Sequence, residues 1–241
     1  MNSYKIITLF QLIILLGIFN SCGGSKKNDT VTDYDSRPIV CFGDSLTYGQ
    51  GAAAGQTYPD FLQKKVKVPV INAGRNGHTL EDGLKRVNED VIGKDPQLVI
   101  INFGGNDLFE GFTVAEVKKN LEDIIAMLDN GKRKIYVSDW IPDSAVNSQS
   151  SAVINAQRMA NDVPALTLIE LTNYADEFKA ALLSLSTKAN VEVVQGVLEG
   201  VYGDPELMYD HIHPNSRGYE IMADNYFQAI KSYLETNNLL K

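Results

Sequence analysis

Cysteine and histidine are scarce in this chain of 241 residues, and their scarcity limits the chemistry available to it. The two cysteines, Cys22 and Cys41, cannot build a disulfide framework, and no Cys-x-x-Cys pair is present to hold zinc. With only His78, His211 and His213 available, a site with several histidine ligands is hard to assemble. We therefore expect neither a bound metal nor another cofactor.

Positive charge is also in short supply. The chain has 22 Lys and Arg residues against 30 Asp and Glu residues, which gives a formal net charge of -8 at pH 7. Short basic runs such as Lys64-Lys65 and Lys132-Arg133-Lys134 are too small to reverse the sign of such a surface. Because an acidic surface repels phosphate backbones, we expect no nucleic acid partner.

A short apolar stretch follows Lys5 at the N-terminus. It covers the fourteen residues Ile6–Phe19 and is interrupted by only three residues of other kinds. At about 1.5 Å per residue, a helix of this length falls short of the roughly 30 Å of hydrocarbon in a bilayer. The pattern is therefore typical of a signal peptide, which we place at residues 1–21.

The residues after this stretch resemble the end of a bacterial lipoprotein signal. In that pattern, the cysteine after the cleavage site becomes the new N-terminus and is acylated through its sulfur. Ser21 fits the pattern, whereas Phe19 and Asn20 stand where Leu and a small residue are usual. The resemblance implies a lipid anchor on Cys22, and with it attachment to a membrane of the bacterial cell envelope, in the outer membrane and periplasm or on the cell surface. Plain secretion and an uncleaved anchor are the alternatives.

The remainder of the chain divides into a tether and one domain. Residues 22–36 are polar and lack hydrophobic periodicity, so they cannot bury enough surface to offset the entropy of ordering. They indicate a flexible tether. From residue 37 to residue 241 the composition is that of a globular domain, with no further boundary and no internal repeat.

Short β-branched runs alternate with helical patterns along this domain. Strands are expected at Ile39–Phe42, Val68–Asn72, Leu98–Phe103, Lys134–Val137 and Val191–Val194. Between them, apolar residues recur at helical spacing, and Thr113 with Glu116 forms a capping box that begins one helix. A last helix is expected from about residue 216 to residue 235. The alternation predicts an α/β fold with a parallel sheet covered by helices on both faces.

In such a sheet, the loops that follow the strands meet at one edge. Ser45 stands at a tight strand-to-helix turn, which projects its hydroxyl into a cleft and directs its backbone N–H toward a developing oxyanion. Glycines in segment 72–77 permit a second N–H donor, and Asn106 offers a side-chain amide as a third. Asp210, three residues before His213, can hold the Nδ1 proton while Nε2 faces the serine. Each fragment alone is a common turn or cap, but together they indicate an acyl-transfer site.

These blocks resemble the GDSL family of serine esterases and lipases, also called SGNH hydrolases. The likeness covers most of the chain from Ile39 to Tyr233 and is similar to the arylesterase and acyl-CoA thioesterase I branch. The segments that carry it are Tyr58-Pro59, Val70-Ile71-Asn72-Ala73-Gly74, Leu98-Val99-Ile100-Ile101 and Leu198-Glu199-Gly200-Val201-Tyr202-Gly203-Asp204-Pro205. The resemblance implies a flavodoxin-like three-layer α/β/α sandwich with a parallel sheet.

The resemblance also implies roles for individual residues. Ser45 would be the nucleophile, His213 the base and Asp210 the residue that orients it. The backbone amides of Ser45 and Gly77, with the side chain of Asn106, would form the oxyanion hole. The implied activity is hydrolysis of a small acyl ester or thioester through an acyl-enzyme.

Two alternatives remain open. One is a carbohydrate O-acetyl esterase of the same family, and the other is a lipoprotein that only binds a ligand in a hydrolase-like cleft. The completeness of the set of catalytic residues favours an enzyme. Two departures from the branch are His78, where Asp is usual, and a connection from Ile141 to Leu171 that is longer than usual. We expect His78 and His211 to be bystanders, and the long connection to form a wall of the acyl or alcohol pocket.

Overall fold

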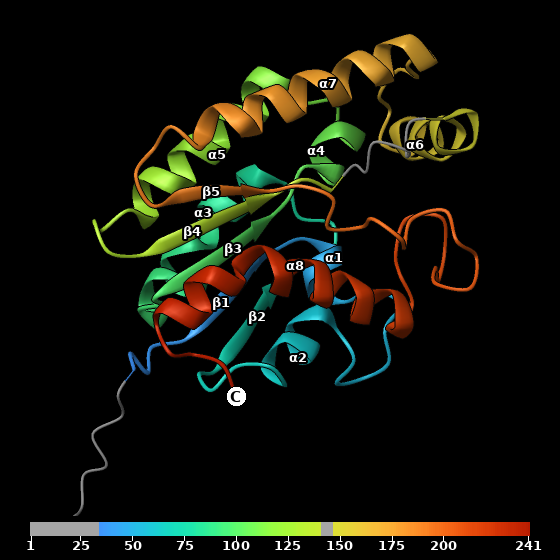
Figure 1. The fold of residues 1–241 in the computed structure, drawn as a ribbon. Coiled ribbons are helices and arrows are strands. Elements are labelled where there is room, and N and C mark those ends of the chain that lie inside the picture. Colours follow the sequence, from blue (N-terminus) through green and yellow to red (C-terminus); the bar gives the residue numbers. More distant parts are fainter. Residues whose placement is uncertain (1–33, 141–146) are drawn as a thin grey trace, which may run out of the picture. The chain divides into compact units, whose positions relative to one another are not determined.

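The computed structural model describes residues 34–140 and 147–241 (Figure 1). The expected signal peptide, Cys22 and most of the tether lie outside the described residues, and so does the first part of the long connection. Within the described ranges, no helix is both long enough and apolar enough to cross a membrane.

The described residues contain a five-stranded parallel sheet with the strand order β2-β1-β3-β4-β5. The strands are β1 (Ile39–Gly43), β2 (Val70–Gly74), β3 (Leu98–Asn102), β4 (Lys134–Ser138) and β5 (Val191–Val194). The expected α/β class and parallel sheet are therefore confirmed. Each expected strand is present, and β5 has the expected bounds.

The strand β2 begins two residues later than the sequence pattern indicates. Pro69 has no N–H to donate to a ladder, so the apolar run before it does not extend the strand. The side chain of Gln63 takes over at this point: its Nε2 donates to the carbonyl of Val68 at 3.0 Å, and its Oε1 accepts the N–H of Val70 at 2.8 Å. Val68 is buried in the core all the same.

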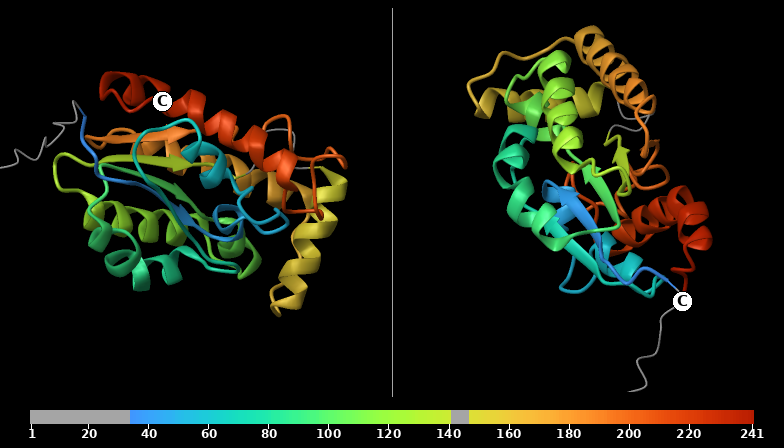
Figure 2. Two further views of the ribbon diagram at one scale, coloured as in Figure 1. Left: turned by 90° about the horizontal axis from the view of Figure 1, so that it is seen from below. Right: turned by 90° about the vertical axis from the view of Figure 1, so that its left-hand side faces the viewer.

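Helices cover both faces of the sheet (Figures 1 and 2). One face packs against α2 (Tyr58–Gln63) and α8 (Ser216–Thr236), and the other packs against α3 (Leu80–Asp90), α5 (Val114–Leu128) and α7 (Leu168–Leu185). Shorter elements are α1 (Ser45–Tyr48), the single 3₁₀ turn η1 (Ile92–Lys94) and α4 (Gly105–Phe109), and α6 (Ser148–Ala160) lies in the long connection. The Thr113 and Glu116 capping box begins α5 as expected.

The inner strand β1 shows how the sheet is buried on both sides. Ile39 and Cys41 face α2 and α8, whereas Val40 and Phe42 face α3 and α5, and all four are fully buried. Burial of each large apolar side chain contributes roughly 1.5–3 kcal/mol. Because both faces are covered, the strand is apolar throughout rather than alternating. Burial also raises the pKa of the Cys41 thiol to about 12, which keeps this cysteine unreactive.

Candidate active site

Ser45 lies two residues after the end of β1, at the first position of α1. Asp44 caps this helix, and its carboxylate accepts the backbone N–H of Leu46 at 3.0 Å. The end of β2 packs tightly against the same turn, since a Cβ atom at Gly74 would lie 2.0 Å from the backbone nitrogen of Tyr48. Glycine is therefore required at position 74 for the two segments to approach.

A chain of hydrogen bonds links Ser45, His213 and Asp210. The Oγ atom of Ser45 lies 2.9 Å from Nε2 of His213, and Nδ1 of the same imidazole lies 2.8 Å from Oδ2 of Asp210. These distances are within hydrogen-bond reach for a nucleophile, a base and the group that orients the base. The structure thus brings together three residues separated by up to 168 positions in the chain.

The carboxylate of Asp210 is held by its own turn. Its Oδ1 atom accepts the backbone N–H groups of Ile212 and His213, each at 2.7 Å. Partial burial raises the pKa of Asp210, but the hydrogen bonds from His213 and Ile212 outweigh this effect and bring the pKa below its ordinary value. The side chain therefore stays ionised at neutral pH and favours a positive charge on the imidazole.

The turn before α8 is fixed at both ends. The backbone N–H of Tyr209 donates to the carbonyl of His213 at 2.8 Å. Asn215 caps α8 by accepting the N–H of Arg217, and its Nδ2 donates to the carbonyl of Glu206 at 2.9 Å. These hydrogen bonds hold the turn that positions the imidazole of His213.

Three further donors face the same cleft. Gly77 has a left-handed conformation with φ +76, and its backbone N–H, like that of Ser45, donates to no acceptor within the described residues. Asn106 in α4 donates one N–H of its amide to the carbonyl of His78 at 3.0 Å. Because an amide carries two N–H groups, the other remains for a ligand. All three donors line one pocket of about 300 Å³ together with His213.

Arg86 on α3 connects the loops that carry these groups, and the sequence analysis missed it. The side chain is buried, and Nη2 donates to the carbonyl of Gly43 at 2.7 Å while Nη1 donates to the carbonyl of Ala73 at 2.8 Å. Nη1 also lies 2.9 Å from the carboxylate of Asp90, and the guanidinium stacks 4.4 Å from the ring of Phe42. One side chain thus ties the ends of β1 and β2 together, just before the nucleophile turn and the oxyanion loop.

The rest of the pocket has an apolar wall. It includes Phe109 from α4, Trp140 after β4 and Ile212. The Phe109 and Trp140 rings meet edge to face at 6.4 Å between centroids. Gln157 of α6 also lines this pocket, so the described part of the long connection does reach the catalytic cleft.

The two remaining histidines lie outside the hydrogen-bonded chain. The carbonyl of His78 accepts the hydrogen bond from Asn106, and burial lowers the pKa of the His78 imidazole below the ordinary value. His211 is exposed and lines a neighbouring pocket. Over residues 34–140 and 147–241, no group of three or more His, Cys, Asp or Glu side chains is placed to hold a metal ion.

A serine, an imidazole and a carboxylate in sequence, opposite a set of N–H donors, form the arrangement of a serine hydrolase. Residues 41–221 match the model of the GDSL-like lipase/acylhydrolase family, and the chain belongs to this family. It is a carboxylic ester hydrolase, as the sequence resemblance implies.

Comparison with known proteins agrees with this assignment. The chain is 26% identical over 194 residues to the thioesterase 1/protease 1/lysophospholipase L1 of Escherichia coli (strain K12), covering 77% of this chain and 79% of that protein. It is 24% identical over 206 residues to an arylesterase of Vibrio mimicus, covering 83% and 90%. An uncharacterized lipoprotein of Bacillus subtilis (strain 168), YqeF, is 26% identical over 132 residues, which is 51% of each chain.

Among solved structures, the lipase/acylhydrolase of Enterococcus faecalis superposes with a TM-score of 0.60 at 27% identity. The match covers 85% of this chain and 97% of that one. The expected SGNH hydrolase fold is therefore confirmed.

Proposed function

We propose that Ser45, His213 and Asp210 form the catalytic triad of this ester and thioester hydrolase. The observation that carries the proposal is the unbroken pair of hydrogen bonds, 2.9 Å from Ser45 to His213 and 2.8 Å from His213 to Asp210. As the Ser45 oxygen bonds to the substrate carbonyl carbon, Nε2 of His213 takes the hydroxyl proton. Asp210 stabilises the resulting imidazolium without taking the proton itself.

The same imidazole serves the second half of the reaction. When the bond from the carbonyl carbon to the leaving oxygen or sulfur breaks, His213 returns its proton to the leaving group, and the acyl group stays on Ser45. A water molecule then attacks this ester, again giving its proton to His213, and the carboxylic acid departs as the Ser45 hydroxyl re-forms. No net proton or electron is consumed by the enzyme.

The negative oxygen of each tetrahedral intermediate needs donors that are already in place. We assign this role to the backbone N–H groups of Ser45 and Gly77 and to the amide of Asn106, which line the same pocket as the nucleophile. The hydrogen bond from Asn106 to the carbonyl of His78 supports the assignment, because it fixes the amide plane before substrate arrives.

The acyl group of the substrate fits the apolar wall of the pocket. Phe109, Trp140 and Ile212 lie beside the nucleophile and offer aromatic and aliphatic surface rather than charge. Such surface favours a hydrocarbon acyl chain.

Attachment to the cell envelope through a lipid on Cys22 is also proposed. It is supported by the sequence of residues 6–22 and by the likeness to a protein described as a lipoprotein. The acylated cysteine would then hold the hydrolase domain near a membrane.

Replacement of the nucleophile tests the triad. Ser45→Ala should lower kcat for p-nitrophenyl acetate by about 10⁴- to 10⁶-fold, because removal of a triad nucleophile leaves only binding and oxyanion stabilisation. The exposed Ser184→Ala on α7 is the matched control and should keep full activity. A Ser45→Ala protein that is folded and keeps more than about a tenth of the wild-type rate would show that the nucleophile lies elsewhere. Labelling of the wild type, but not of Ser45→Ala, by a fluorophosphonate gives an independent readout.

A further inference from the structure

The exposed lysines of this acidic chain are unevenly distributed over the fold. Residues 34–140 and 147–241 contain nine exposed lysines. Three of them, Lys85, Lys119 and Lys231, form ion pairs with acidic side chains on their own helices. The other six have no ion pair with an acidic side chain of the described ranges, and they are Lys64, Lys67, Lys94, Lys132, Lys188 and Lys241.

All six of these lysines lie at one end of the sheet. Each of the segments before β2, β3, β4 and β5 carries one or two of them. Lys241 belongs with the segment before β2, because its backbone N–H donates to the carbonyl of Lys65 at 3.1 Å. Segments that precede parallel strands gather at the same end of a sheet. We call the end that carries these six lysines the amino edge.

The amino edge lies opposite the active site. Figures 1 and 2 show the loops before β4 and β5, and the segment before β1, at the end of the sheet away from α4 and α6. Hydrogen bonds join these segments: the backbone N–H of Ile135 donates to the carbonyl of Asn190 at 2.9 Å, and Nε2 of Gln97 donates to the carbonyl of Asp35 at 2.7 Å. Ser45 and the oxyanion donors follow strands, so they lie at the other end.

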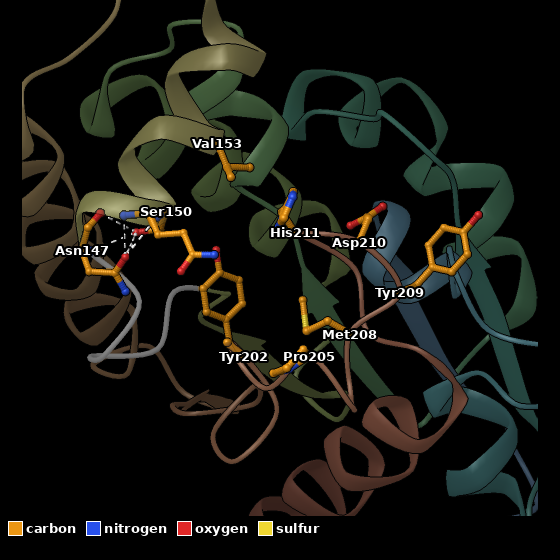
Figure 3. A pocket seen from close by; sticks show the side chains of 11 residues that line it. Asn147, Ser150, Val153, Tyr202, Pro205, Met208, Tyr209, Asp210 and His211 are labelled. Atoms are coloured by element: carbon orange, nitrogen blue, oxygen red, sulfur yellow. Dashed lines mark hydrogen bonds between the residues drawn. The ribbon is translucent and has the colours of Figure 1, made fainter.

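The end of the sheet that holds the active site has the opposite charge pattern. Residues 199–210 contain no Lys or Arg, and their exposed acids are Glu199, Asp204, Glu206 and Asp210. Figure 3 shows Asp210, with Tyr209 and His211, beside a pocket that neighbours the catalytic one. Among the described residues that line these two pockets, none is Lys or Arg. An anionic surface would therefore meet cations at the amino edge and carboxylates near the active site.

The chain also enters the domain at the amino edge. Tyr34 precedes β1, and Nζ of Lys67 lies 5.5 Å from the centroid of its ring. Cys22, the proposed site of the lipid, stands twelve positions before Tyr34. Twelve residues span at most about 40 Å, and a domain of about 200 residues is roughly 40 Å across. An anchor on Cys22 thus allows the active-site end to rest on a bilayer only if the intervening chain is almost fully extended.

Charge and chain length therefore favour the same orientation. Lysines close to a bilayer with anionic lipids are attracted to it, and the attraction falls off within a Debye length. A net charge of -8 opposes a free encounter with such a bilayer, but an anchor keeps the lysines at a high local concentration. Resting on the lipid anchor proposed above, we propose that the amino edge is a docking surface for an anionic lipid bilayer, so that the catalytic pocket opens away from the membrane that holds the anchor.

Protection of lysines from an amine reagent tests this surface on the full chain. The lipidated protein, purified in detergent, is added to vesicles of phosphatidylcholine alone or of phosphatidylcholine mixed with phosphatidylglycerol. A membrane-impermeant N-hydroxysuccinimide ester then labels the lysines, and peptide mass spectrometry measures each rate. On the anionic vesicles, Lys64, Lys67 and Lys241 should react at least about 3-fold more slowly than on the neutral vesicles, and high salt should abolish the difference.

Lys85 and Lys119, on α3 and α5, are the internal controls and should react equally on both kinds of vesicle. Equal rates for Lys64 and Lys67 on the two kinds of vesicle would overturn the proposal. Slower labelling of Lys85 and Lys119 would overturn it as well, because another face would then meet the lipid. Protection of Lys64 and Lys67 in detergent without vesicles would assign the amino edge to a second copy of the chain instead.

Reversal of two charges provides the second arm. In a variant with Lys64→Glu and Lys67→Glu, Lys241 should react at the same rate on both kinds of vesicle, while the anchor keeps the protein bound to them. The matched control carries Lys85→Glu and Lys119→Glu, which change the net charge equally on other faces, and Lys241 should stay protected in it. Continued protection of Lys241 in the first variant would contradict docking through the amino edge.

Turnover of p-nitrophenyl acetate reports the orientation of the active site. It should be equal on neutral and anionic vesicles, because the catalytic pocket stays open to water on both. A loss confined to the anionic vesicles would show that the pocket faces the lipid. Failure of the proposed anchor is a distinct result, since the wild type would then sediment with neither kind of vesicle. A wrong triad would leave the lysine rates unchanged, because labelling does not depend on Ser45.

Discussion

The side-chain amide of Asn106 is held in position before the oxyanion forms. Its hydrogen bond to the carbonyl of His78 holds one N–H at 3.0 Å and leaves the other for the oxyanion. Asn106→Ala should therefore lower kcat by about 10²- to 10³-fold with little change in KM, because the donor acts mainly in the transition state. Steady-state kinetics on p-nitrophenyl acetate measures the two constants separately.

The matched control for this variant is Asn88→Ala, which removes an exposed amide from α3. It should leave both constants unchanged. If Asn106→Ala instead raised KM and left kcat alone, the amide would bind the ground-state substrate and the oxyanion assignment would be wrong.

The sequence pattern predicts the three residues of the hydrogen-bonded chain as site residues, but it does not predict two of their neighbours. Ser45, Asp210 and His213 stand on turns whose residue types have few other uses together, so the pattern predicts them. Arg86 and Trp140 show no such pattern: an arginine on a helix and a tryptophan after a strand are common. Their positions at the site depend on how α3 and β4 pack in the fold, and this packing cannot be inferred from the neighbouring residues in the sequence.

At the scale of elements, the expected sheet is correct because its inner strands β1, β3 and β4 are buried on both faces and therefore mostly apolar, whereas the edge strands β2 and β5 are partly exposed. The helix α7 has no counterpart among the expected elements, although its buried face has clear helical spacing. Exposed apolar residues at Leu168, Ile169 and Leu183 blur that face and make the stripe hard to recognise. The strand β2 begins only at Val70 because Pro69 has no N–H to donate to a strand ladder. This effect is hard to predict from the sequence, because it depends on which strand lies beside Pro69.

The helix α6 forms a wall of the catalytic pocket, and its position there predicts that it limits the length of the acyl chain. Ile154 and Arg158 are buried and hold the helix in place, with the Arg158 guanidinium donating to the carbonyl of Leu108 on α4. Gln157 projects into the catalytic pocket from the same helix. Gln157→Trp should therefore narrow the pocket and lower kcat/KM for p-nitrophenyl octanoate about 10-fold more than for p-nitrophenyl acetate.

Ala152→Trp is the control, since it adds the same ring to an exposed position of α6 that does not line the catalytic pocket. An unchanged preference between octanoate and acetate in a folded Gln157→Trp protein would show that the acyl chain leaves the pocket by another route. The expectation that the long connection forms a wall of the acyl pocket would then be wrong.

For the molecule as a whole, three buried carboxyl groups link stability to pH. Burial raises the pKa of Asp44 to about 7, that of Asp107 to about 7 and that of Asp139 to about 6. In an unfolded chain such groups titrate near about 4. Between these values the folded protein holds protons that the unfolded chain has released, so these groups make the free energy of unfolding fall as pH rises through that window.

Asp107 allows this linkage to be isolated. Its carboxylate accepts the N–H of Leu80 at 3.1 Å, and an amide oxygen preserves that acceptor. The free energy of unfolding of Asp107→Asn, relative to the wild type, should therefore increase between pH 4 and pH 7 by about 1–3 kcal/mol. Urea unfolding at several pH values measures it, with the exposed Asp176→Asn as control. A difference that stays flat with pH would mean that Asp107 is ionised throughout.

Location in the cell depends on the proposed anchor. Cys22→Ser removes the thiol that acylation needs, so the hydrolase should move from the membrane fraction to the soluble fraction of cells that express the full chain. Cys41→Ser, at a cysteine buried within β1, controls for loss of a thiol elsewhere. A Cys22→Ser protein that remained with membranes would point to an uncleaved N-terminal anchor. If the wild type and Cys22→Ser were both secreted, lipidation would be excluded.

Trp140 is the sole tryptophan of the chain, and it lies in the wall of the catalytic pocket between the rings of Phe109 and Phe178. Its indole nitrogen is buried and has no hydrogen-bond partner among the residues that the structure describes. Any intrinsic tryptophan emission of this protein therefore originates within the active site. An unlabelled sample carries its own optical reporter, whose intensity and wavelength should follow occupancy of the acyl pocket without background from other indoles.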